Sequence, residues 1–113
     1  MILIVEDEIS VCDILCEILK MSYKTISASN QSELLKINIT DIKLVITDSK
    51  IQNITSDYVV DMFKETTVPI ILMSGYDIDM IGKYSNMSNY VEFISKPFSI
   101  SHVLKIVKQY YPQ

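Results

Sequence analysis

Five side chains that could do chemistry lie far apart in the sequence, yet each follows the end of a short apolar run: Glu6, Asp7, Asp48, Ser74 and Lys96. In open α/β sheets, ligands bind beyond the carboxyl ends of the parallel strands. If the apolar runs are strands of such a sheet, these side chains converge on one edge. The sequence therefore predicts a polar site at the carboxyl edge of a sheet.

The side chains expected at this edge suit the binding of a phosphate-like anion. Three carboxylates close together repel one another, so either one keeps its proton or a cation resolves the conflict. The donors are all oxygens, with no His or Cys nearby, which favours a hard ion such as Mg²⁺. Lys96 and Ser74 would contact the other side of a tetrahedral oxyanion. Because the chain has no Arg, Lys96 must supply the cationic contact. This set is typical of phosphoryl transfer.

Apolar runs and helical patterns alternate along the whole chain. Short runs rich in β-branched residues predict five strands, over Ile2–Val5, Tyr23–Ala28, Leu44–Thr47, Val68–Met73 and Tyr90–Ile94. Apolar residues at helical spacing predict five helices, over Ile9–Leu19, a short segment after the cap Asn30, Asp57–Glu65, Asp77–Met87 and Ile100–Tyr111. Ser49–Ser56 is predicted to be a polar loop. This order predicts an α/β fold with one parallel sheet and helices on both of its faces.

Length and composition limit the classes of protein that this chain can belong to. Its 113 residues predict a single domain over 1–113, and 49% hydrophobic residues exclude disorder. A net charge of −4 lacks the basic surface that binds nucleic acid, and no apolar run is long enough to cross a membrane. Cys12 and Cys16 are not a CxxC pair, so we expect buried core thiols and a cytoplasmic location.

Four segments in this order resemble the receiver domain of two-component response regulators. They are Ile-Leu-Ile-Val-Glu6-Asp7-Glu8, Leu-Val-Ile-Thr-Asp48, Ile-Ile-Leu-Met-Ser74-Gly75 and Phe93-Ile-Ser-Lys96-Pro97-Phe98. Together they cover the chain from Ile2 to Tyr110. The resemblance implies a flavodoxin-like, doubly wound, five-stranded parallel sheet in the order 2-1-3-4-5, with five helices.

The resemblance also implies the chemistry of a phosphoacceptor. Asp48 would accept a phosphoryl group from a sensor histidine kinase or a histidine phosphotransfer protein, and aspartate is an established covalent carrier of phosphate. Asp7 and Asp48 would bind Mg²⁺ directly, and Glu6 would act through water. The backbone carbonyl of Lys50 would be a further ligand. The domain would catalyse its own phosphorylation and slow dephosphorylation while acting mainly as a signalling module.

The remaining matched residues would transmit the change to a downstream effector protein or domain. Ser74 and Lys96 would bind oxygens of the phosphoryl group. Phe93 occupies the position of the family's switch aromatic and would turn inward as Ser74 moves. The Lys96–Pro97 peptide bond would be cis.

The sequence departs from the family's pattern after Asp48. Where the family often has Met-Pro and Asp-Gly, this chain has Ile51-Gln52 and Thr55-Ser56. Lys50 and Tyr76 lie two residues after Asp48 and Ser74, where the family modulates hydrolysis. The altered loop leaves open a second interpretation, in which the chain is a degenerate receiver that binds partners without being phosphorylated.

Overall fold

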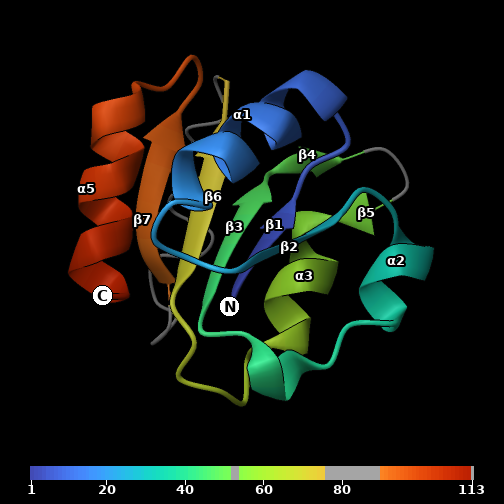
Figure 1. Ribbon diagram of the computed structural model, residues 1–113. Coiled ribbons are helices and arrows are strands. Elements are labelled where there is room, and N and C mark those ends of the chain that lie inside the picture. Colours follow the sequence, from blue (N-terminus) through green and yellow to red (C-terminus); the bar gives the residue numbers. More distant parts are fainter. Residues whose placement is uncertain (52–53, 76–89, 113) are drawn as a thin grey trace.

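A five-stranded parallel sheet forms the centre of the molecule in a computed structural model that describes residues 1–51, 54–75 and 90–112 (Figure 1). The strands are β1 (Ile2–Val5), β2 (Thr25–Ala28), β3 (Leu44–Asp48), β6 (Ile70–Ser74) and β7 (Tyr90–Ser95). They lie in the order β2-β1-β3-β6-β7. This is the predicted order 2-1-3-4-5, so the fold prediction is confirmed.

Helices cover both faces of the sheet. The described helices are α1 (Ile9–Leu19), α2 (Gln31–Leu35), α3 (Ser56–Met62), α5 (Ile100–Tyr110) and the 3₁₀ turn η1 (Ile39–Asp41). The fourth predicted helix, Asp77–Met87, lies outside the described residues. In the part of the chain that the structure describes, no helix is long and apolar enough to cross a membrane.

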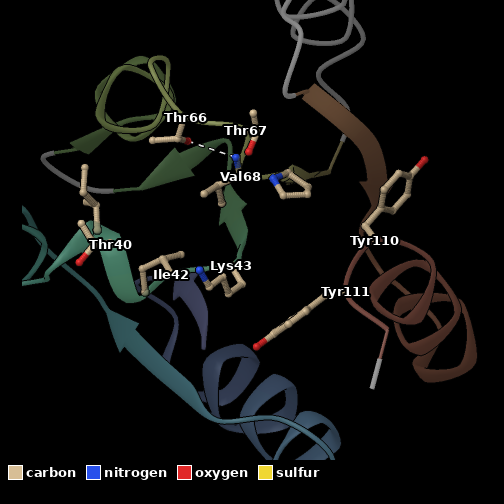
Figure 2. A pocket seen from close by; sticks show the side chains of 10 residues that line it. Thr40, Ile42, Lys43, Thr66, Thr67, Val68, Tyr110 and Tyr111 are labelled. Carbon is tan, nitrogen blue, oxygen red and sulfur yellow. Dashed lines mark hydrogen bonds between the residues drawn. The ribbon is translucent and has the colours of Figure 1, made fainter.

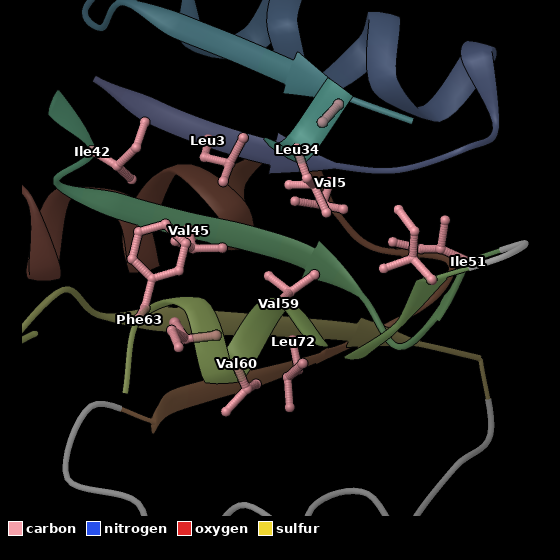
Figure 3. Packing of buried hydrophobic residues seen from close by; sticks show 13 residues of the cluster. Leu3, Val5, Leu34, Ile42, Val45, Ile51, Val59, Val60, Phe63 and Leu72 are labelled. Atoms are coloured by element: carbon pink, nitrogen blue, oxygen red, sulfur yellow. The ribbon is translucent and has the colours of Figure 1, made fainter. Parts of the chain in front are cut away.

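Alternating side chains of the central strands fill two separate cores. Leu3 and Val5 of β1 pack with residues of α2 and α3, such as Leu34 and Val59 (Figure 3). The neighbouring side chains of β1, such as Ile4, pack on the other face with residues of α1 and α5. Strands buried on both faces need apolar side chains at every position, which explains the continuous runs in the sequence.

Side chains at the helix N-termini explain where α2 and α5 begin. The Oδ1 of Asn30 accepts a hydrogen bond from the backbone N–H of Glu33 at 2.9 Å. The Glu33 carboxylate in turn accepts one from the N–H of Ser29 at 2.8 Å. Asn30 is therefore the predicted cap of α2. At α5, the Oγ of Ser99 accepts a hydrogen bond from the N–H of His102 at 3.0 Å.

Two details of the sequence prediction are wrong. The stretch predicted as a loop contains an antiparallel pair of short strands, β4 (Lys50–Ile51) and β5 (Ile54–Thr55). Cys12 and Cys16 were predicted to be buried core residues, but both are half-buried. The reason is that the buried positions of α1 are Leu15 and Leu19, so the two thiols lie beside this contact rather than at its centre.

Candidate functional site

The register of the sheet brings the ends of four strands to one edge. Val5 at the end of β1 pairs with Thr47 of β3, one residue before Asp48. Asp48 pairs with Met73 of β6, one residue before Ser74. Ser74 pairs with Ser95 of β7, one residue before Lys96. Residues predicted from widely separated segments therefore lie at the same level of the sheet.

An acidic cluster forms at this edge. Glu6, Asp7 and Asp48 each offer a carboxylate oxygen, and these oxygens lie within 4.8 Å of one another. Glu6 and Asp48 are buried, with 1% and 8% of their surface exposed, and Asp7 is exposed. The backbone N–H of Glu8 donates a hydrogen bond to Oε1 of Glu6 at 3.3 Å, which helps to orient that carboxylate. Three carboxylate oxygens at such spacing can hold a hard divalent cation.

Lys96 connects two of these carboxylates. Its Nζ lies 3.0 Å from Oδ2 of Asp48 and 3.2 Å from Oε2 of Glu6. The backbone N–H of Lys96 donates a hydrogen bond to the carbonyl of Ser74 at 2.8 Å, which joins the residue to the end of β6. One ammonium group therefore faces two buried carboxylates. With both carboxylates ionised, the three groups together carry a net negative charge.

Burial and charge change the proton affinity of these groups. The pKa of Glu6 is raised to about 7, first by burial and then by the charge of Asp48, whereas Lys96 opposes the shift. Burial alone would lower the pKa of Lys96, but the hydrogen bond and charge of Asp48, with those of Glu6, raise it above its ordinary value. Lys96 is therefore charged at neutral pH, and Glu6 holds its proton more tightly than an exposed glutamate does.

The structure describes most of the other predicted site residues. Ser74 ends β6 and is 2% exposed. Phe93 of β7 is half-buried and packs against the core on the α2 and α3 side. Lys50 begins β4, two residues after Asp48. Tyr76 lies outside the described residues. The Lys96–Pro97 peptide bond is cis, as predicted.

Two neighbours of Asp48 were missed by the sequence prediction. Thr47 is fully buried and its Oγ1 donates a hydrogen bond to the backbone carbonyl of Asp48 at 3.1 Å. Ser49 is 7% exposed, and its hydroxyl has no hydrogen-bond partner within the described residues. The sequence does place a hydroxyl residue on each side of Asp48 at the end of a strand. This could have drawn attention to them, because a buried hydroxyl group needs a hydrogen-bond partner.

A cavity lies away from this cluster, at the opposite edge of the sheet (Figure 2). It has a volume of about 510 Å³, and Lys43 and Pro69 on its wall come directly before β3 and β6. Figure 2 shows the hydrogen bond from the N–H of Val68 to Oγ1 of Thr66, at 3.2 Å, in the same wall. The wall is made of Thr, Tyr and apolar side chains with one Lys, so no acidic cluster lines it.

Comparison with known proteins identifies one family. The family model of the response regulator receiver domain matches residues 2–108. The receiver domain of NtrX from Brucella abortus superposes with a TM-score of 0.83 at 25% identity, covering 96% of each chain. The N-terminal signal receiver domain of a response regulator from Bacteroides fragilis gives a TM-score of 0.83 at 21% identity, covering 99% of this chain and 96% of that one. Comparison with curated proteins gives no match.

Proposed function

Because this chain belongs to the response regulator receiver domain family, we propose that it is a phosphoacceptor switch in which Asp48 carries the phosphoryl group. The observation that supports this most directly is the contact of Lys96 Nζ with Asp48 Oδ2 at 3.0 Å, within the cluster formed with Glu6 and Asp7. A carboxylate with an ammonium partner and two further acids is what a phosphoacceptor site requires. The proposed module comprises residues 1–113.

In the proposed reaction, an Oδ atom of Asp48 attacks the phosphorus of a phosphohistidine on a sensor histidine kinase or a histidine phosphotransfer protein. The P–O bond to Asp48 forms while the P–N bond to the donor histidine breaks, and the histidine nitrogen takes up a proton. In a separate second step, water attacks the phosphorus of the acyl phosphate. The P–O bond to Asp48 breaks, inorganic phosphate leaves and Asp48 returns to its carboxylate. Most of the acceleration in such a transfer comes from positioning and charge neutralisation.

The acidic cluster fits Mg²⁺ as the cofactor. Carboxylate oxygens of Glu6, Asp7 and Asp48 lie within 4.8 Å of one another. Asp7 and Asp48 would bind the ion directly, Glu6 would act through water, and the backbone carbonyl of Lys50 is proposed as a further ligand. Oxygen donors and excess negative charge suit a hard cation that keeps part of its water shell. Bound Mg²⁺ would neutralise the charge of the incoming phosphoryl oxygens.

Lys96 and Ser74 are proposed to bind the transferred group. Lys96 already contacts the carboxylate that would become phosphorylated, so a small movement of its ammonium would follow a phosphoryl oxygen. Ser74, at the end of the neighbouring strand, would donate its hydroxyl to another oxygen. Charge-assisted hydrogen bonds of this kind are the stronger ones in proteins.

The output is proposed to be a change of the partner-binding face near β7. Movement of Ser74 toward the phosphoryl group would allow Phe93, which is half-buried on β7, to turn further inward. The proposed partners are the kinase or phosphotransfer protein and a downstream effector protein or domain, in the cytoplasm and without direct contact with nucleic acid or membrane.

One observation favours a second function. The short antiparallel strands β4 and β5 pair Lys50 with Thr55 directly after Asp48, where the sequence lacks the family's usual Pro and Gly. A changed loop next to the acceptor would suit a degenerate receiver that binds partners without phosphorylation. The intact set of Asp7, Asp48 and Lys96 favours the phosphoacceptor.

Incubation with acetyl phosphate and Mg²⁺ separates the two functions. A phosphoacceptor gains one phosphoryl group per chain, which the mass of the intact protein detects. It gains none when Mg²⁺ is omitted from the incubation. Asp48→Asn should remain unlabelled, and the exposed Asp61→Asn is the matched control that should be labelled like the wild type. Absence of labelling in the wild type, or labelling of Asp48→Asn, would contradict the proposed function.

A further inference from the structure

Two thiols lie one turn apart on α1. Cys12 and Cys16 are the only cysteines of the chain, and both are free and half-buried. Residues four apart on a helix lie on the same face. Burial raises the pKa of Cys12, and the hydrogen bond from Ser27 opposes the shift, whereas the charge and hydrogen bonding of Cys16 add to it. The helical spacing therefore places the two thiols side by side on one face of α1.

The helix prevents these thiols from forming a direct disulfide. In a helix, the Cβ atoms of residues four apart are about 5–6 Å apart, whereas a disulfide requires about 3.8 Å. An atom inserted between the sulfurs, with bonds of about 2.3 Å to each as in metal thiolates, spans the wider gap. The geometry of α1 suits a shared ligand atom and excludes a disulfide unless the helix unwinds.

The number of available protein ligands limits which element could bridge the two sulfurs. A structural zinc site needs four protein ligands. In residues 1–51, 54–75 and 90–112, the groups of three or more His, Cys, Asp or Glu side chains that could hold an ion do not include either cysteine. The pair therefore offers two sulfurs only. The pair suits an element that forms three bonds, two of them to sulfur and the third to a group that it already carries.

The structure also provides space beside one of the thiols. Cys12 lines a cavity of about 180 Å³ together with Ser27 and Ala28 of β2 and Asp13 of α1. A small substituent carried by the bound atom could lie in this cavity. Access to Cys12 therefore does not require α1 to leave the sheet.

We propose that Cys12 and Cys16 form a dithiol site that chelates trivalent arsenic compounds of the type R–As(OH)₂. Both As–O bonds break and two As–S bonds form. Each thiol proton leaves with a hydroxyl group as water, so two waters are released and no electrons are transferred. The organic group R stays on arsenic as its third substituent. The cavity beside Cys12 shares Glu6 with the acidic cluster, but the arsenic chelate uses only the two thiols and does not depend on the proposed phosphoacceptor function.

Phenylarsine oxide is the probe that tests the site, with intact-protein mass spectrometry as the readout. At equimolar probe, the folded wild type should carry one phenylarsenic group in place of two hydrogens. The adduct should survive a hundredfold excess of 2-mercaptoethanol and be removed by dithiothreitol, because only a dithiol competes with a chelate. Circular dichroism should show that the helix content is retained.

Three variants identify the residues that bind arsenic. Cys12→Ser and Cys16→Ser should each lose the adduct when 2-mercaptoethanol is present. The double variant Cys16→Ser with Glu17→Cys keeps two thiols but moves one of them to another face of α1, at an exposed position. It should also lose the adduct. A wild-type adduct that the monothiol removes, one that forms only in urea, or one that the double variant retains would overturn the proposal.

Discussion

The Nζ of Lys96 lies 3.0 Å from Oδ2 of Asp48 although 48 residues separate them in the sequence. The same ammonium lies 3.2 Å from Oε2 of Glu6. The side chain of Lys96 is 21% exposed, whereas those of Glu6 and Asp48 are 0% and 11% exposed. In the ion pairs that the described residues form here, one partly solvated cation faces two buried acids. The expected behaviour of the site with pH and mutation follows from this imbalance.

Lys96→Met should destabilise the protein, more strongly at high pH. Removal of one partner from a buried ion pair costs about 3–5 kcal/mol, and the partial exposure of Lys96 reduces this to about 1–3 kcal/mol at pH 8. At pH 5, Glu6 can take up a proton, so the loss should be smaller. Urea unfolding at both pH values measures it. Lys20→Met, which removes an exposed ion pair with Glu17, is the control and should have little effect at either pH.

Asp48→Asn should fold and should not lose stability. The charge of Asp48 raises the pKa of Glu6, so its removal relieves repulsion and leaves Lys96 to pair with Glu6 alone. We expect the free energy of unfolding at pH 8 to be unchanged or to rise by up to about 1 kcal/mol. The measurement is urea unfolding without divalent cations. A loss of more than about 1 kcal/mol would mean that Asp48 mainly stabilises the fold.

The stability contributed by Glu6 should fall as the pH rises. The pKa of Glu6 is raised from 4.5 to about 7 in the folded protein. Below pH 4.5 both the folded and the unfolded chain hold the proton. Between pH 4.5 and 7 the unfolded chain releases it and the folded one retains it, so unfolding is favoured increasingly. Above pH 7 the penalty is constant, on the order of 3 kcal/mol.

Comparison with Glu6→Gln isolates this contribution from those of the other acids. The variant cannot lose a proton at this position, so its stability relative to the wild type should rise from pH 4.5 to 7 and then stay level. A difference that is independent of pH would contradict the raised pKa of Glu6.

Mg²⁺ binding should release protons near neutral pH. An ion bound by the acidic cluster favours ionised Glu6, and metal binding to protonated ligands displaces their protons. We expect weaker Mg²⁺ binding at pH 6 than at pH 8. Titration calorimetry in two buffers of different ionisation enthalpy at pH 7 measures the released protons. Equal apparent enthalpies in the two buffers would show that no proton is released and that Glu6 does not respond to the ion.

Ser49→Ala should stabilise the protein. The hydroxyl of Ser49 is buried, with no hydrogen-bond partner among the described residues. A buried unsatisfied polar group costs about 1–3 kcal/mol, so its removal should raise the free energy of unfolding by about 1 kcal/mol. Ser22→Ala, at an exposed turn, is the control and should change little. A destabilised Ser49→Ala would indicate that the hydroxyl is bonded to water in solution.

The sequence predicted the sheet and its polar edge because both depend on local patterns. Continuous apolar runs such as Ile2–Val5 identify strands that are buried on both faces, and parallel connection then brings their carboxyl ends together. The hairpin of β4 and β5 was missed because strands of two residues have no periodicity. The half-burial of Cys12 and Cys16 was missed because it depends on how α1 is rotated against the sheet.

The electrostatics of the site could not be predicted in the same way. The residue type alone does not reveal the pKa of a glutamate. The pKa of Glu6 is raised by burial and by Asp48, which lies 42 residues away in the chain. That Lys96 contacts both acids depends on the register of β7 against β6. Such relationships require coordinates, because no local pattern encodes the depth of a side chain below the surface.

Beryllofluoride with Mg²⁺ should cause a conformational change that extends from Asp48 through Ser74 to β7. Beryllofluoride stands in for a phosphoryl group on Asp48 and supplies acceptors for Ser74 and Lys96. Because the backbone N–H of Lys96 donates to the carbonyl of Ser74 at 2.8 Å, movement of either residue is passed to the end of β7. Beryllofluoride shifts the equilibrium between the two arrangements of the site only if it binds one of them more tightly. Contacts with Ser74 and Lys96 would provide this difference in affinity.

Amide chemical shifts measure this change residue by residue. We expect them to spread from Asp48 through Ser74 to residues 91–96, with a changed ring environment for Phe93, and to be absent in Asp48→Asn under the same conditions. Phe93→Leu is the second variant, because it keeps an apolar side chain on β7 but removes the ring. It should bind beryllofluoride and show shifts around Asp48 that are reduced beyond Ser74. Shifts confined to the surroundings of Asp7 and Asp48 in the wild type would mean that the site binds the group without transmitting a change, which would favour the degenerate receiver.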